Sequence, residues 1–131
     1  MDITVVFSGN KKIDAQVEGF TIQTDQPVAG GGDGSAPSPY QVFLASLAAC
    51  AGIYVVGFLQ NRDLPLEGVR LVQHHFYDPT TRRLTKIEHE IFLPPSFPEK
   101  YREALARVVG MCAVKKTIMD PPEIEVKITP A

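Results

Sequence analysis

Residues 38–59 read SPYQVFLASLAACAGIYVVGFL, and no charged residue occurs among them. Ser38 and Gln41 form an S-x-x-Q capping box, in which each side chain can bond the backbone N–H of the other residue. Pro39 stands at the first helical position, where the missing N–H of proline does no harm. The stretch therefore predicts a helix from about Pro39 to Gln60 that is apolar, and so buried, on every side.

Small residues recur along this helix at helical spacing, Ala45 with Ala49 and Ala48 with Gly52, and they allow another helix to approach closely. A chain of 131 residues supplies little cover for such a helix, so we expect a second subunit to cover part of it. The uncharged run just reaches the length of a membrane span. Its many Ala, Gly and Ser residues and the strands predicted on both sides favour a core helix instead, and we expect no membrane partner.

Length and composition indicate one ordinary globular domain over residues 1–131. The net charge is −2 and no cluster of Lys and Arg stands out, which argues against a nucleic-acid partner. Residues 1–8 lack the basic and apolar regions of a signal peptide. We therefore expect a cytoplasmic protein, in which the two cysteines are kept reduced.

The N-terminal part predicts a three-stranded antiparallel meander, because residues 2–7, 12–17 and 20–24 alternate between apolar and polar side chains. Residues 26–37 are rich in glycine but lack the spacing of a phosphate-binding motif. We interpret this stretch as a lid or connector.

After the central helix in the sequence, residues 67–77 and 84–93 predict a β-hairpin that is closed by a loop rich in turn-forming residues. All three histidines lie here. His74 and His75 point to opposite faces of their strand, whereas His74 and His89 could share one face. No third and fourth ligand stands at a spacing typical of zinc, so we expect no metal site.

The C-terminal part repeats a capping box at Ser96 and Glu99 and continues as an amphipathic helix that leads to Cys112. Gly110 is a plausible break before a short helical turn at 113–119. Residues 123–129 alternate and predict a last strand. The fold class is therefore α+β.

Cys50 and Cys112 are far apart in the sequence, so only tertiary structure can bring them together. A helix N-terminus or a nearby cation lowers the pKa of a thiol. Both lie close to Cys112 in the sequence, as a predicted helix start and Lys115, whereas neither lies close to Cys50. Free cysteines are also common as small buried hydrophobes, and that interpretation stays open here.

The segments 38–50 (SPYQVFLASLAAC) and 112–118 (CAVKKTI) resemble the two cysteine motifs of the OsmC/Ohr family, the osmotically inducible and organic hydroperoxide resistance proteins. The order of predicted strands and helices matches as well, so the resemblance covers nearly the whole chain. It implies an intertwined α+β homodimer in which two central helices pack against strongly curved sheets, with sites at the subunit interface.

The resemblance also implies a thiol-dependent peroxidase that reduces organic hydroperoxides without a bound cofactor. Cys50 matches the attacking cysteine, which becomes a sulfenic acid, and Cys112 matches the resolving cysteine, which condenses with it to a disulfide. A dithiol reductant, in this family often a lipoyl group, would restore the pair.

The chain departs from the family pattern at two charged positions. In the best-characterised peroxidases an Arg of the N-terminal sheet and a Glu near the helix start hold the attacking thiolate. Here Tyr40 stands at the Glu position, with Gln41 next to it, and no Arg precedes Arg62. Lys11 or Lys12 could supply charge, but a lysine lacks the planar fork of arginine.

The resemblance is thus to a divergent member. Hydroperoxide reduction by the two cysteines is the leading expectation. The alternatives are a non-catalytic binding module with an apolar pocket at the dimer interface, and a purely structural dimer.

Overall fold

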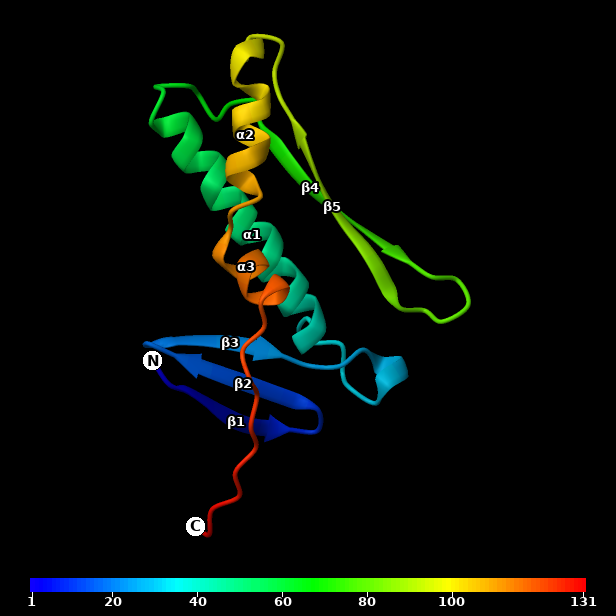
Figure 1. Ribbon diagram of the computed structural model, residues 1–131. Helices are drawn as coiled ribbons and strands as arrows, with labels where there is room; N and C mark the ends of the chain where they lie inside the picture. Colours follow the sequence, from blue (N-terminus) through cyan, green and yellow to red (C-terminus); the bar gives the residue numbers. More distant parts are fainter. The chain divides into compact units, whose positions relative to one another are not determined.

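The computed structural model describes residues 1–131, which fall into two compact units, Met1–Ser46 and Leu47–Ala131 (Figure 1). Strands and helices are segregated along the chain, as expected for the α+β class. The central helix α1 (Pro39–Gln60) has the predicted bounds. Its capping box is confirmed, because the Ser38 N–H donates to Gln41 Oε1 at 2.9 Å and the Gln41 N–H donates to Ser38 Oγ at 3.2 Å.

The first unit contains the predicted meander of β1 (Ile3–Gly9), β2 (Lys12–Val17) and β3 (Phe20–Thr24), antiparallel and in the order β1-β2-β3. The register aligns Val5 with Ala15 and Ala15 with Ile22, so the alternating apolar side chains of all three strands share one face. This face is not covered within the single chain, where Phe7 is 81% exposed.

The second unit is built around the part of α1 that follows Ser46. Its hairpin consists of β4 (Arg70–Tyr77) and β5 (Leu84–Phe92), close to the predicted bounds. It also holds two shorter helices, α2 (Arg102–Val109) and α3 (Ala113–Met119). Figure 1 shows α2 and the hairpin running beside α1. The buried core comes from α1, the segment before α2, and α2 itself: Ala51, Val55, Phe58, Leu59, Phe97, Leu105 and Val109.

The start of the second helix differs from the prediction. Ser96 and Glu99 form no capping box. After Pro98 the chain enters a 3-10 turn (Glu99–Tyr101), and no side chain caps this turn. Glu99 instead pairs with Arg102, with 2.6 Å between Oε2 and Nε. Because Pro98 adopts an extended conformation, the first turn begins one residue after proline, and the reciprocal bonds of a box are not made.

The expectation that α1 is buried on every side is wrong for the single chain. Its buried residues form one stripe, and the opposite face carries Ala45, Ala49 and Ile53, of which Ile53 is 69% exposed. By length and composition alone α1 could cross a membrane, but core helices of soluble proteins meet the same measure. The prediction failed because a sequence that is apolar all round does not say which chain covers each side.

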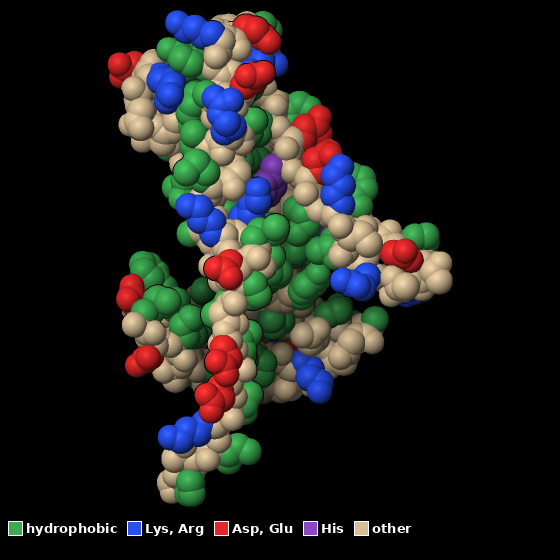
Figure 2. Space-filling view, viewed as in Figure 1, with side chains coloured by type: hydrophobic (Ala, Val, Ile, Leu, Met, Phe, Trp, Pro, Cys, Tyr) green, Lys and Arg blue, Asp and Glu red, His purple; other side chains and the backbone are tan.

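The predicted C-terminal strand is also absent. Residues 120–131 pair with no strand, and the alternating Ile124, Val126 and Ile128 are almost fully exposed. In Figure 2 this tail carries hydrophobic, acidic and basic side chains in close succession. An alternating segment becomes a strand only where it pairs with a sheet edge, and this segment pairs with none in the single chain.

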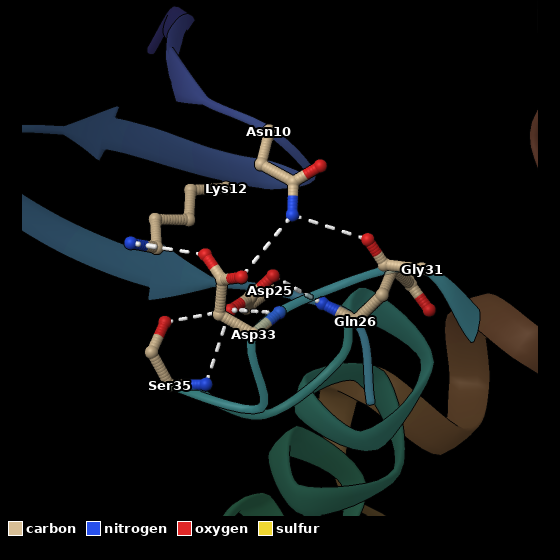
Figure 3. Close-up of polar contacts among 7 residues, drawn as sticks. All are labelled: Asn10, Lys12, Asp25, Gln26, Gly31, Asp33 and Ser35. Carbon is tan, nitrogen blue, oxygen red and sulfur yellow. Dashed lines mark hydrogen bonds and ion pairs between the residues drawn. The ribbon is translucent and has the colours of Figure 1, made fainter. Parts of the chain in front are cut away.

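The loop of residues 26–37 is organised around the buried carboxylate of Asp25 (Figure 3). It accepts hydrogen bonds from the Ser35 hydroxyl at 2.6 Å and from the backbone N–H groups of Gln26, Asp33 and Ser35 at 2.7, 3.3 and 3.0 Å. These bonds, the Ser35 hydroxyl first, lower the pKa of Asp25 to about 2. Gly32 fits this turn because a Cβ there would lie 2.0 Å from the Gln26 carbonyl oxygen.

We expect the substitution Asp25→Asn to loosen this loop, because an amide cannot accept all four donors. Amide hydrogen exchange should show lost protection at Asp33 and Ser35, whereas Asp14→Asn, which removes a carboxylate with one bonding partner, should leave both protected. In the native chain the carboxylate contributes fully above its ordinary pKa of 3.8, and its contribution is lost as the pH falls through about 2. Unchanged exchange in Asp25→Asn would contradict this assignment.

Candidate functional site

The second unit brings together the two cysteines. Cys50 lies in the middle of α1 and is partly buried, and Cys112 is fully buried at the residue that caps the start of α3. Both are free thiols, and they lie close enough that each shifts the pKa of the other. Tertiary structure therefore brings the two cysteines together, although they are far apart in the sequence.

The surroundings of Cys50 lower the pKa of its thiol. The largest cause is the backbone N–H of Val114, and the Cys112 thiol and the backbone N–H of Ala113 act in the same direction against the opposing effect of burial. Donor groups near a thiol favour its charged form and therefore its ionisation. No charged side chain contributes, so dipoles at the start of α3 act here instead of a cation.

Burial raises the pKa of Cys112, and its bond to Cys50 adds to the rise. Its Sγ accepts a hydrogen bond from the backbone N–H of Lys115 at 3.3 Å, and this bond caps α3. The bond lowers the pKa of Cys112, but less than burial raises it. The local sequence had favoured Cys112 as the more acidic thiol, and the structure reverses that order. The reason is tertiary, since the N–H groups of Ala113 and Val114 act on the thiol of another helix.

This arrangement is chemically asymmetric. The pKa of Cys50 is lowered and the pKa of the neighbouring Cys112 is raised, so Cys50 ionises more readily than Cys112. A thiolate is the nucleophilic form of cysteine, and an adjacent thiol can condense with its oxidised product. The pair can therefore support attack by one sulfur and resolution by the other.

The charged and aromatic residues noted from the sequence have other partners. Arg62 donates to the Phe58 carbonyl oxygen at 3.2 Å and stacks over the Phe58 ring. Lys12 pairs with Asp33 at 3.4 Å, and Tyr40 stacks on Phe43. None of these residues is among the groups that set the pKa of Cys50.

The second unit contains a cavity of about 530 Å³, whose wall includes neighbours of both cysteines but neither cysteine itself. Leu47, one turn before Cys50 on α1, lines it, and so does Lys115, whose N–H bonds the Cys112 sulfur. The rest of the wall comes mainly from β5 and α3, including Ile87, His89, Ile118 and Met119. Sequence analysis missed His89 as part of this site; only the strand register could have revealed it.

The prediction that His74 and His89 share a face is wrong. The register pairs Gln73 with His89 and His75 with Ile87, so His75 and His89 share a face while His74 turns away and contacts Glu90 at 2.8 Å. A register shift between Phe76 and Tyr77 next to the loop causes the difference, because a one-residue slip exchanges the two faces of a strand. No group of three or more His, Cys, Asp or Glu side chains is placed to hold a metal ion.

We expect Val114→Pro to raise the pKa of Cys50, because it deletes the N–H that lowers this pKa most, at a helix position whose N–H has no intrahelical partner. Ala113→Pro, one residue earlier, deletes a weaker donor and should raise it less. The pH dependence of Cys50 alkylation in a Cys112→Ser background measures both shifts. Equal profiles for the two proline variants and their parent would show that these N–H groups do not act on Cys50.

Comparison with known proteins agrees with this layout. The family model described as OsmC-like protein matches residues 32–127. No curated protein matches the chain. One similar structure is a protein from Psychrobacter arcticus assigned to the osmotic stress and detoxification response, with a TM-score of 0.72, 22% identity, and 88% of this chain and 85% of that chain covered.

A second structure, an OsmC-like protein from Mycoplasma pneumoniae, has a TM-score of 0.68 and 19% identity over 92% of this chain and 87% of that one. A third, the organic hydroperoxide resistance protein OsmC from Legionella pneumophila, has a TM-score of 0.57 and 19% identity over 89% and 87% of the two chains. These likenesses show the fold. Since the family model spans most of the sequence, including both cysteines, the chain belongs to the family of OsmC-like proteins.

Proposed function

We propose that this protein is a thiol-dependent peroxidase that reduces organic hydroperoxides, with Cys50 as the nucleophile and Cys112 as the resolving cysteine. The observation that carries the proposal is that the fold brings Cys112, the capping residue of α3, near Cys50 in the middle of α1, where the two thiols shift each other's pKa in opposite directions. The fold relative from Legionella, named for organic hydroperoxide resistance, agrees with the proposal in kind.

In the first step the Cys50 thiolate attacks the terminal oxygen of the hydroperoxide. The S–O bond forms as the O–O bond breaks, and the departing alkoxide takes up a proton to leave as an alcohol. Cys50 is oxidised to a sulfenic acid, and the hydroperoxide is reduced. The N–H groups of Ala113 and Val114 lower the pKa of Cys50 and so increase the share of the reactive thiolate.

In the second step the sulfur of Cys112 attacks the Cys50 sulfenic acid, forming the disulfide and releasing water that contains the transferred oxygen. A dithiol, of which a lipoyl group is one kind, then exchanges with the disulfide and becomes the cyclic disulfide while both cysteines return to thiols. Because the cycle starts from two thiols, we place the protein in the reducing cytoplasm.

We expect Cys50→Ser to abolish consumption of an alkyl hydroperoxide in a stopped-flow assay with a dithiol reductant. Cys112→Ser should still react once, and intact mass should show one added oxygen, whereas the native chain should lose two hydrogens as the disulfide forms. The isosteric control Ser46→Cys leaves both native thiols in place and should keep wild-type activity. Full activity in Cys50→Ser would end the peroxidase proposal and leave a binding or structural role for the same fold.

We also propose that two chains form an intertwined homodimer. The single chain exposes 9982 Å², roughly 3000 Å² more than a folded monomer of this mass typically exposes. Over two chains this excess is about 6000 Å², which is the scale of the largest obligate interfaces. Exposed apolar surface lies on the two elements for which the family resemblance implies contacts, the Ala45–Ala49–Ile53 face of α1 and the apolar sheet face, and also on the alternating tail.

The exposed face of α1 supports a helix–helix contact. A Cβ added at Gly52 would meet nothing within 4 Å, so space lies over this turn of the helix. Ala45 and Ala49 present only methyl groups on the exposed side. Such small residues let two helix backbones come close, and the tail could then supply an additional strand to the sheet of the partner.

We expect Ala49→Arg to convert the dimer into monomers in light-scattering or native mass measurements, because the substitution places a charge in a close apolar contact. Ala106→Arg is the matched control, since it makes the same change at an exposed position of α2. A wild-type monomer, or a dimer that tolerates Ala49→Arg as well as Ala106→Arg, would contradict the proposed interface.

A further inference from the structure

The hairpin face that packs Leu71 and Ile91 against the core also carries three polar side chains, His75, Gln73 and His89, all partly buried. The Gln73 amide joins the two rings, and we call these three residues the amide bridge. Gln73 Oε1 lies 2.8 Å from His89 Nε2, and Gln73 Nε2 lies 2.8 Å from His75 Nε2. The register allows both bonds, because it places Gln73 opposite His89 and leaves His75 on the same face.

An amide has one accepting end and one donating end, and this asymmetry decides where each ring holds its proton. The NH₂ group of Gln73 donates, so His75 accepts at Nε2 and holds its proton on Nδ1. The oxygen of Gln73 accepts, so His89 donates from Nε2 and its lone pair is on Nδ1. One side chain therefore holds the two neutral rings in opposite tautomers.

This arrangement does not accommodate a second proton on His75. A charged imidazole donates from both nitrogens, so a charged His75 would direct an N–H at the NH₂ group of Gln73. Turning the amide over removes the conflict, because the oxygen then faces His75. The NH₂ group then faces His89, which must accept at Nε2 and carry its proton on Nδ1. Neither orientation of the amide suits two charged rings.

The surroundings of His89 oppose a charge on that ring. Burial first, then the charges of Lys115 and His75, lower its pKa, so the ring is neutral at pH 7. Lys115 of α3 lines the same cavity as His89, and no Asp or Glu lines it. Residues 42–59 of α1 include no charged side chain, and α2 contributes none to the cavity wall. An added charge on His89 is therefore disfavoured.

The other charged side chains of the two strands, together with His74, lie on the opposite face of the hairpin. Strand alternation places these residues there: Arg70, His74, Lys86, Glu88 and Glu90. His74 contacts Glu90 at 2.8 Å, and Lys86 pairs with Glu88 at 2.6 Å. Lys86 also reaches the cavity wall, but its ammonium is paired. The charges that reach His89 are thus those of Lys115 and His75.

We propose that the amide bridge is a proton-driven tautomer switch. A proton taken up by His75 turns the Gln73 amide over, and neutral His89 loses its proton at Nε2 and gains one at Nδ1, so that the bridge gains one proton in total. His75 and Gln73 lie outside the cavity wall, whereas His89 lines it. Acidification thus converts the His89 nitrogen that Gln73 does not contact from an acceptor into a donor, and adds no charge to that ring. Gln73 is the positioning residue of this switch.

Nitrogen NMR of protein labelled at histidine tests the switch, because it reports the tautomer and the charge of each ring during a pH titration. At pH 7 we expect the Nδ1–H tautomer for His75 and the Nε2–H tautomer for His89. As the pH falls, His75 should become charged, and His89 should change to the Nδ1–H tautomer with the same midpoint while it stays neutral. His74→Gln, on the opposite face, is the control and should preserve this coupled change.

Gln73→Glu tests the amide itself. A carboxylate of nearly the same size accepts at both oxygens, so both rings can donate to it, and His89 should keep the Nε2–H tautomer throughout the titration. Three results would overturn the inference: the Nδ1–H tautomer of His89 already at pH 7, a charged His75 beside an unchanged His89, or a coupled change that survives in Gln73→Glu. No cysteine takes part, so Cys50→Ser should retain the switch, and the peroxidase proposal and this one can fail separately.

Discussion

The contact on which the site depends is the stripe of apolar side chains that α1 buries against α2 and the residues around it. Ala51 and Val55 lie in this stripe, and Leu105 and Val109 of α2 face them in the same core. Cys50, next to Ala51 in the sequence, is thereby fixed at the edge of the core rather than in its middle. Burying one large aliphatic side chain contributes about 1.5–3 kcal/mol, so the stripe holds the two helices firmly enough to position a sulfur.

The path of the chain after α2 completes the site. The chain turns at Gly110 and Met111, and Cys112 becomes the capping residue of α3. The first N–H groups of this helix have no intrahelical backbone partner, and those of Ala113 and Val114 lower the pKa of Cys50. The two thiols are thus distinguished by backbone dipoles and burial, without a charged side chain. Dissolved ions screen surface charges strongly but partly buried dipoles much less. The difference between the pKa values of the two thiols therefore depends little on the salt concentration.

Local patterns in the sequence were sufficient for the strands of the meander, for α1 and its Ser38 cap, and for the hairpin. They failed where the answer depended on contacts remote in the sequence. The pKa order of the cysteines is one such case, because the donors to Cys50 belong to Ala113 and Val114. The exposed side of α1 and the unpaired tail are two further cases. An apolar or alternating pattern predicts that a segment will be buried or paired, but it does not say which segment or chain it will contact.

The register shift between Phe76 and Tyr77 shows that one extra residue in a strand can decide which side chains face the site. With regular pairing outward from Tyr77 and Leu84, Gln73 would face the side opposite to His89, and the amide that connects the two imidazoles would be out of reach. Two chains of this family with the same cysteine motifs, one with the shift and one without, would therefore present different cavity walls to their ligands. Ligand choice can diverge in this way through the length of a hairpin strand while the thiol chemistry stays the same.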